Sequence, residues 1–159
     1  MDLSAVAAAL EASEFGAWVR SSPIAYPVAN LVHLLGLVML IGGIGVVDLR
    51  LIGFARSVPL ASLARFLTPV AIVDLALLVA SGFFLFAADA GKLFHSTVFR
   101  WKVAILSIAI VNAILFEALW GHRFERWTTG PSYTAVAMAA ASIGLWLLTA
   151  TLGRLIAYF

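Results

Sequence analysis

One histidine lies inside the first long apolar stretch of the chain. His33 is roughly nine residues into that stretch, which in a helix rising about 1.5 Å per residue is roughly 13 Å deep. Asn30, His33 and Gly36 share one helix face. Imidazole is a usual ligand of haem iron, and a glycine one turn away leaves space for a flat ring, so this face predicts a b-type haem site. The alternative is packing, with His33 hydrogen-bonded to a neighbouring helix that Gly36 admits closely.

The other histidines limit how a haem could be held. Two axial ligands must lie at one depth on opposite sides of the ring, but His95 falls in a predicted loop and His122 at the far end of the third apolar stretch. A haem would therefore be held by His33 alone, or by two copies of His33 in a homodimer. Either arrangement suits electron exchange with quinol.

Three further polar residues fall within apolar stretches. Asp74 is in the second, whereas Asn112 and Glu117 are in the third. Ionisable groups at membrane depth are costly and are therefore functional candidates. We expect the three to face one another, so that an uncharged Asp74 could relay protons or bind a quinone head group. The alternative is that Asp74 only joins helices through Asn112, and that Glu117 is solvated or paired with Arg123.

Four apolar stretches must position these residues. The chain has 159 residues, 64% hydrophobic and only 11% charged, against roughly 25% charged in soluble domains. About 20 apolar residues in a helix span a membrane, and backbone amides in lipid must be hydrogen-bonded internally. The sequence therefore predicts an all-α, integral membrane four-helix bundle, forming one domain over residues 23–159, with spans at about 24–47, 66–88, 99–120 and 133–158.

Residues 1–22 differ from these stretches. Apolar residues from Leu3 to Trp18 recur with helical spacing, but Glu11 and Glu14 interrupt them, and Pro23 follows. This pattern predicts a short amphipathic helix at the membrane interface. A frayed tail is the alternative.

Basic residues indicate the orientation. The loops after the first and third spans concentrate arginines, whereas on the other side Lys102 and Arg154 lie within helix ends. Short loops rich in lysine and arginine stay in the cytoplasm. We therefore predict that both termini lie outside the cytoplasm.

Small residues predict where helices meet closely. Gly42, Gly43 and Gly45 in the first span, and Ala140 with Gly144 in the fourth, would let helices approach. At the end of the first span, we expect Asp48 to pair with Arg50 or Arg126.

Several functions have no sequence support. Without cysteine there is no disulfide or thiolate site, and His95 beside Asp89 is too little for a metal site. The chain has no basic cluster with interleaved aromatic residues, which argues against nucleic acid. It also lacks a phosphate loop, a nucleophile elbow and paired catalytic carboxylates, so an enzyme is not favoured.

Five motifs between Pro27 and Phe116 resemble a family of small four-span bacterial inner-membrane proteins of no established activity. They are His33–Gly36, Asp48–Gly53, Ser81–Phe86, Phe99–Lys102 and Asn112–Phe116. Members often carry a histidine where this chain has Glu117. The resemblance implies a four-span fold in the bacterial inner membrane. A looser likeness to membrane b-type cytochromes rests only on helix number and a buried histidine.

Three functions follow from these expectations. The first is a b-type haem protein that exchanges electrons with quinone. The second is a non-catalytic subunit or scaffold, in a homo-oligomer or a larger membrane complex. The third is a small proton-coupled transporter that uses Asp74, Asn112 and Glu117.

Overall fold

Four long helices form the body of the protein in the computed structural model, which describes residues 2–121 and 130–158. Each is long and apolar enough to cross a membrane, so the predicted all-α, multi-pass fold is confirmed. The long helices are α3 (Ala25–Ile52), α4 (Leu60–Ala88), α6 (Thr97–Trp120) and α7 (Tyr133–Leu155), and shorter ones are α1 (Leu3–Ala12), α2 (Glu14–Ser21) and α5 (Ala90–His95).

The first two spans extend beyond their apolar stretches because polar and conformational signals at their ends fix the boundary. α3 continues to Ile52 and stops at Gly53, whose φ of 115° is left-handed. Glycine adopts this conformation freely, and the Gly53 N–H bonds to the carbonyls of Leu49 and Arg50. α4 then begins after Pro59.

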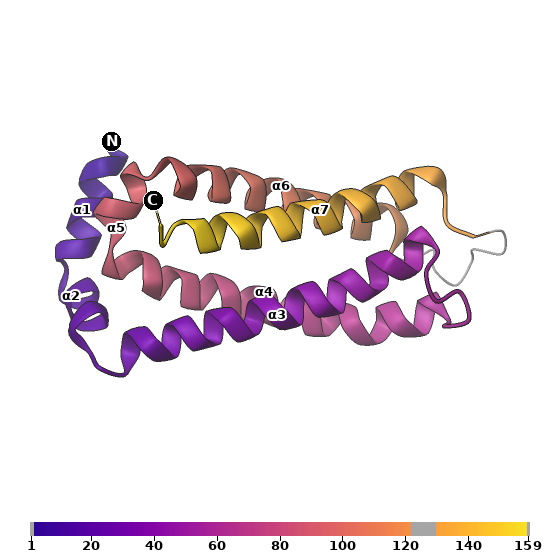
Figure 1. The fold of residues 1–159 in the computed structure, drawn as a ribbon, viewed down its shortest axis with the longest axis horizontal. Helices are drawn as coiled ribbons and strands as arrows, with labels where there is room; N and C mark the ends of the chain where they lie inside the picture. The colour runs from indigo at the N-terminus through magenta and orange to yellow at the C-terminus, as the bar shows by residue number, and fades with distance from the viewer. Residues whose placement is uncertain (1, 122–129, 159) are drawn as a thin grey trace.

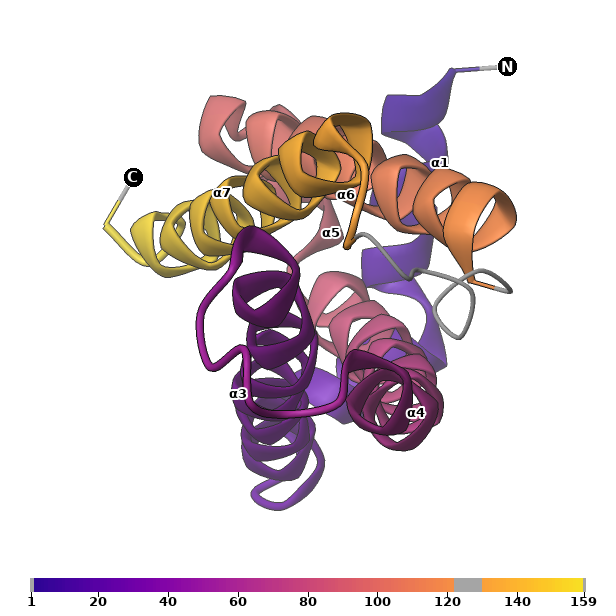
Figure 2. The same ribbon diagram turned by 90° about the vertical axis from the view of Figure 1, so that its right-hand side faces the viewer.

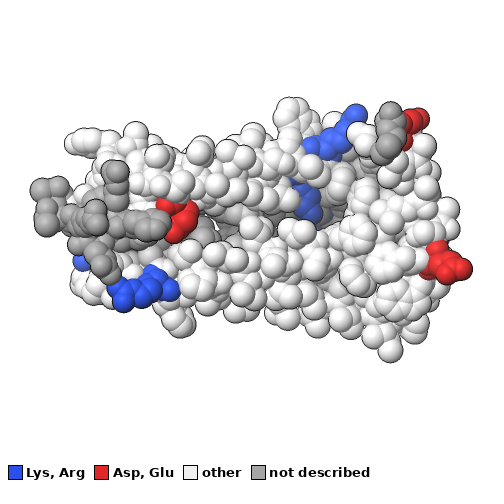
Figure 3. Space-filling model, turned by 180° about the vertical axis from the view of Figure 1, so that it is seen from behind, with Lys and Arg blue, Asp and Glu red and all other residues white. Residues whose placement is uncertain are grey.

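The spans form two antiparallel hairpins, α3 with α4 and α6 with α7, and α3 packs along α7 to join them (Figures 1 and 2). The shared core is small and contains Leu40, Ala71, Leu78, Ala109 and Trp146. On the opposite side, between α4 and α6, the molecule is hollowed, and charged side chains border the hollow (Figure 3). Ala109 is the one described residue of α6 that is buried, so α6 leaves most of its surface to the surroundings.

The N-terminal segment crosses one end of this bundle (Figure 1). Two helices replace the single predicted one, because the Ser13 hydroxyl accepts a hydrogen bond from the Gly16 N–H at 3.1 Å and starts α2 there. Glu11 accepts from the Gly91 N–H at 2.6 Å, and Arg20 donates to the Ala88 carbonyl at 2.7 Å. The segment is therefore docked on α4 and α5.

Gly16 makes the closest approach in this docking. A Cβ at this position would lie 2.6 Å from the Leu10 carbonyl oxygen and 2.8 Å from the Ala87 carbonyl oxygen. Neither backbone oxygen can move freely. We therefore expect Gly16→Ala to lower the free energy of unfolding by about 1–3 kcal/mol, the usual cost of overpacking.

Thermal unfolding in mild detergent measures this effect. Gly144→Ala is the matched control, because a Cβ at Gly144 meets nothing within 4 Å. Equal midpoints for the two variants would show that α2 does not dock as described.

Candidate functional site

His33 is held against α4 by its Nδ1 atom. Nδ1 lies 3.1 Å from the Leu78 carbonyl oxygen and 3.0 Å from the Ser81 Oγ. A carbonyl only accepts, so Nδ1 carries the proton. The Ser81 hydroxyl donates to the Leu77 carbonyl at 2.6 Å, which leaves its oxygen free to accept from His33. The neutral ring therefore keeps its lone pair on Nε2, as histidine ligands of metals commonly do.

The face predicted to carry a haem is covered by α4. A Cβ at Gly36 would lie 3.2 Å from the Leu78 Cγ and 3.4 Å from the Asp74 carbonyl oxygen. Asn30, one turn before His33, is exposed. The residues present offer an imidazole but no room for a porphyrin against Gly36. This arrangement matches the alternative to a haem site, in which His33 bonds to a neighbouring helix that packs closely on Gly36. The haem itself stays a prediction, which a Soret band in the protein from haem-supplied cells would test.

The second predicted group consists of Asp74, Asn112 and Glu117. No hydrogen bond or ion pair joins these three among the described residues. Asp74 is 3% exposed, and its Oδ2 has no partner there. Asn112 donates instead to the Met138 carbonyl of α7 at 3.2 Å. Glu117 is exposed near the end of α6, and Arg123 lies outside the described residues. Asn112 thus joins α6 to α7.

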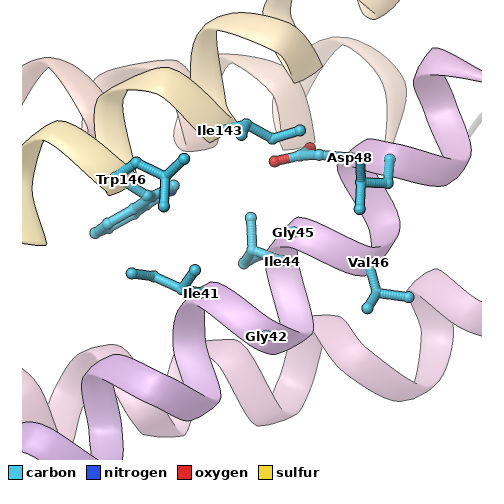
Figure 4. A pocket seen from close by; sticks show the side chains of 10 residues that line it. Ile41, Gly42, Ile44, Gly45, Val46, Asp48, Ile143 and Trp146 are labelled. Carbon is cyan, nitrogen blue, oxygen red and sulfur yellow. The ribbon is translucent and has the colours of Figure 1, made fainter.

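A cavity of about 270 Å³ lies between α3 and α7. Its walls include Ile41, Ile44 and Ile143, and Asp48 and Trp146 reach it from facing helices (Figure 4). Several lining residues are exposed, namely Gly42, Val46, Leu49 and Leu147. These residues belong to helices long and apolar enough to cross a membrane, and the mouth of the cavity lies on the outer surface of the bundle.

Two buried polar atoms on this cavity lack partners among the described residues. They are the Oδ2 of Asp48 and the Nε1 of Trp146, on side chains that are 7% and 5% exposed. The Ser142 side chain of α7 lies beside the Asp48 carboxyl group. Leaving a buried donor or acceptor unpaired costs about 1–3 kcal/mol. Both atoms are enclosed by the protein, so neither is open to a molecule in the cavity.

Asp48 had two expected partners, Arg50 and Arg126, and the structure contradicts only the pairing with Arg50. Asp48 does not pair with Arg50, because the Arg50 guanidinium donates to the carbonyls of Val58 at 2.7 Å and Arg56 at 2.9 Å. The other expected partner, Arg126, lies outside the described residues.

The glycines of α3 were also misinterpreted. A Cβ at Gly42, Gly43 or Gly45 meets nothing within 4 Å, and the same holds at Gly144 in α7. These positions do not admit a neighbouring helix. Gly42 and Gly45 line the cavity, so the missing side chains contribute its volume.

A signal for this site does exist in the sequence of α7. Ser142, Trp146 and Thr149 are spaced i, i+4 and i+7 and therefore share a helix face. All three are buried, and the Thr149 hydroxyl also has no partner within the described ranges. This polar stripe could have been read as the face of α7 that meets α3.

Comparisons with known proteins do not assign the chain to a family. No family, no curated protein and no solved structure matches the chain. The resemblance to four-span bacterial proteins therefore rests on its motifs alone. Within residues 2–121 and 130–158, no group of three histidine or acidic residues is placed to hold a metal ion.

Proposed function

We propose that this protein is a membrane-embedded binding protein for a small, uncharged, lipid-soluble molecule. The molecule enters the cavity between α3 and α7 from the lipid. The observation that supports this function is the cavity itself, which lies between two spanning helices, has a volume of about 270 Å³ and is lined mostly by apolar side chains.

The position of the cavity favours a ligand from the lipid. Its lining residues lie in membrane-spanning helices, and several of them are exposed at its mouth. A ligand that is apolar over most of its surface matches the walls of the cavity, because burying an unpaired polar group against them would cost free energy.

Filling the cavity should weaken this binding. Gly45 lines the cavity, and a Cβ there meets nothing within 4 Å, so the Gly45→Leu side chain takes up ligand volume without a collision at its first atom. Benzophenone is a suitable probe, because it is a lipid-soluble ketone that cross-links to nearby residues under ultraviolet light. In nanodiscs, we expect Gly45→Leu to lower benzophenone labelling of α3 and α7 peptides about tenfold relative to the unaltered protein. This fall is equivalent to about 1.4 kcal/mol of binding free energy.

Gly144→Leu is the control for this experiment. Gly144 is exposed on α7, is open to an added side chain and does not line the cavity. Its labelling should match that of the unaltered protein, as read by peptide mass spectrometry. Labelling that is spread evenly over the four spans, or unchanged by Gly45→Leu, would contradict the proposed function.

The membrane and the orientation are part of the proposal. The resemblance to bacterial proteins supports the bacterial inner membrane. Arg50 in the last turn of α3 and Arg56 in the loop that follows support an orientation with both termini on the periplasmic side. The chain has no cysteine, so a single introduced cysteine is a unique label.

Cysteine labelling in spheroplasts tests this orientation. Glu14 and Ser57 are both exposed, at opposite ends of the bundle. We expect an impermeant maleimide to label Glu14→Cys in intact spheroplasts and Ser57→Cys only after lysis. The reverse pattern would place the termini in the cytoplasm.

The other functions predicted from the sequence have less support. A subunit role in an oligomer or complex fits the small buried part of α6. Haem-linked electron transfer is favoured by the Nε2 lone pair of His33, but Leu78 occupies the space beside Gly36 that a haem would need. Proton-coupled transport has no hydrogen-bonded link among Asp74, Asn112 and Glu117 within the described residues. We therefore propose none of these as the main function.

A further inference from the structure

One basic side chain lies between the helices, in the half of the bundle nearer the termini. Lys102 is half-buried on α6. A Cβ at Gly153 of α7 would lie 3.5 Å from the Lys102 Nζ, and the charge of Lys102 acts on His33 of α3. Lys102 therefore extends toward the other spans and not into the surrounding lipid.

No acidic group of the described residues neutralises Lys102. The ion pair found within residues 2–121 and 130–158 joins Arg20 to Glu11, and Lys102 takes part in no hydrogen bond there. Its neighbour His33 is a neutral ring and brings no negative charge. A charged amine away from water costs free energy unless an opposite charge accompanies it. An anion from outside the chain would supply that charge.

The amine is open to such an anion. Its Nζ has no partner, yet it is not among the enclosed polar atoms of the described part of the chain. Lys102 extends from α6, and His33 lies against α4, where a Cβ at Gly82 would be 3.2 Å from the His33 Cε1. These two helices are not packed along each other. The hollow between them, with basic side chains at its border, is therefore the route to Lys102 (Figure 3).

The remainder of this face of α6 is apolar. Lys102, Leu106 and Ile110 are spaced i, i+4 and i+8 and share the face, and both apolar residues pack partly buried against the core. Phe86 of α4 stacks on Phe99 of α6, with ring centroids 5.4 Å apart. This contact brings the two helices together on the side of Lys102 that faces the termini. A ligand therefore enters from the lipid.

We propose that Lys102 binds the head group of an anionic amphiphile, a molecule with one negative charge on oxygen atoms and a long apolar chain. The ammonium group supplies the opposite charge and three N–H donors, and the chain lies along Leu106 and Ile110. Fatty acids and anionic phospholipids share this chemistry. The site is separate from the α3–α7 cavity, because Lys102 does not line that cavity.

A charged and an uncharged form of one photoactivatable lipid test this site. The charged form is palmitic acid with a diazirine beside its carboxyl group, and the uncharged form is its methyl ester. In phosphatidylcholine nanodiscs at equal probe concentration, we expect the acid to label the α4 and α6 peptides about tenfold more than the ester does. The reason is that only the acid forms an ion pair with Lys102, and that pair is partly shielded from water.

Variants assign this preference to Lys102. Lys102→Met removes the charge at similar length, so acid and ester should label it equally. Lys102→Arg keeps the charge and should keep most of the preference. Arg100→Met is the matched control, because Arg100 is an exposed cation on the same helix, and its removal should leave the preference unchanged. Thermal unfolding midpoints report whether each variant is folded.

Unlabelled competitors identify the source of the anion. Displacement of the probe by palmitate at a lower mole fraction than phosphatidylglycerol assigns the site to a fatty acid, and the reverse order assigns it to a phospholipid. Sodium acetate as effective as palmitate would show that the apolar chain contributes nothing and would overturn the proposed ligand class.

Two further results would overturn the inference. One is equal labelling of the unaltered protein by acid and ester, and the other is an equal loss of preference in Arg100→Met and Lys102→Met. Benzophenone labelling of the α3–α7 cavity is a separate readout, so neither result bears on the proposed function.

Discussion

In a hydrocarbon layer, each polar atom must find its hydrogen-bond partner within the protein or within what it binds. This requirement makes the four spans helical and then governs how the helices meet. His33 bonds to the Leu78 carbonyl and joins α3 to α4, and Asn112 bonds to the Met138 carbonyl and joins α6 to α7. In each hairpin, therefore, one of these polar side chains hydrogen-bonds to a backbone carbonyl of the neighbouring helix. These are the bonds that a lipid environment cannot replace.

The same requirement makes the contact between the hairpins different. Where α3 meets α7, Asp48 and Trp146 each keep an atom without a partner among the described residues, and the glycines nearby leave open volume. The contact of α3 with α4 is close, since Gly36 lies against Leu78 and Gly82 against His33. α3 therefore packs closely on α4 and loosely on α7.

The glycines of α3 show why a small residue has no fixed meaning in a membrane helix. Gly36 and Gly42 both follow an apolar residue of the first span and look alike in the sequence. Gly36 is buried because α4 covers it, whereas Gly42 is exposed because no helix does. Close packing and open volume are opposite uses of the same missing side chain. Which one applies depends on the neighbouring helix, and the local sequence carries no information about that helix.

The sequence by itself determined the four spans, the interfacial segment and the residues that enter the apolar layer, because length, hydropathy and helical spacing are local properties. It also allowed two interpretations of His33, as a ligand or as a helix contact, and could not choose between them. Only the tertiary structure decided which helices are neighbours. That arrangement directed His33 to α4, directed Asn112 to the Met138 carbonyl of α7, and gave Arg50 partners other than Asp48. The physical reason is that a side chain in lipid takes its partner from the helix it faces, and residues far apart in the chain provide that helix.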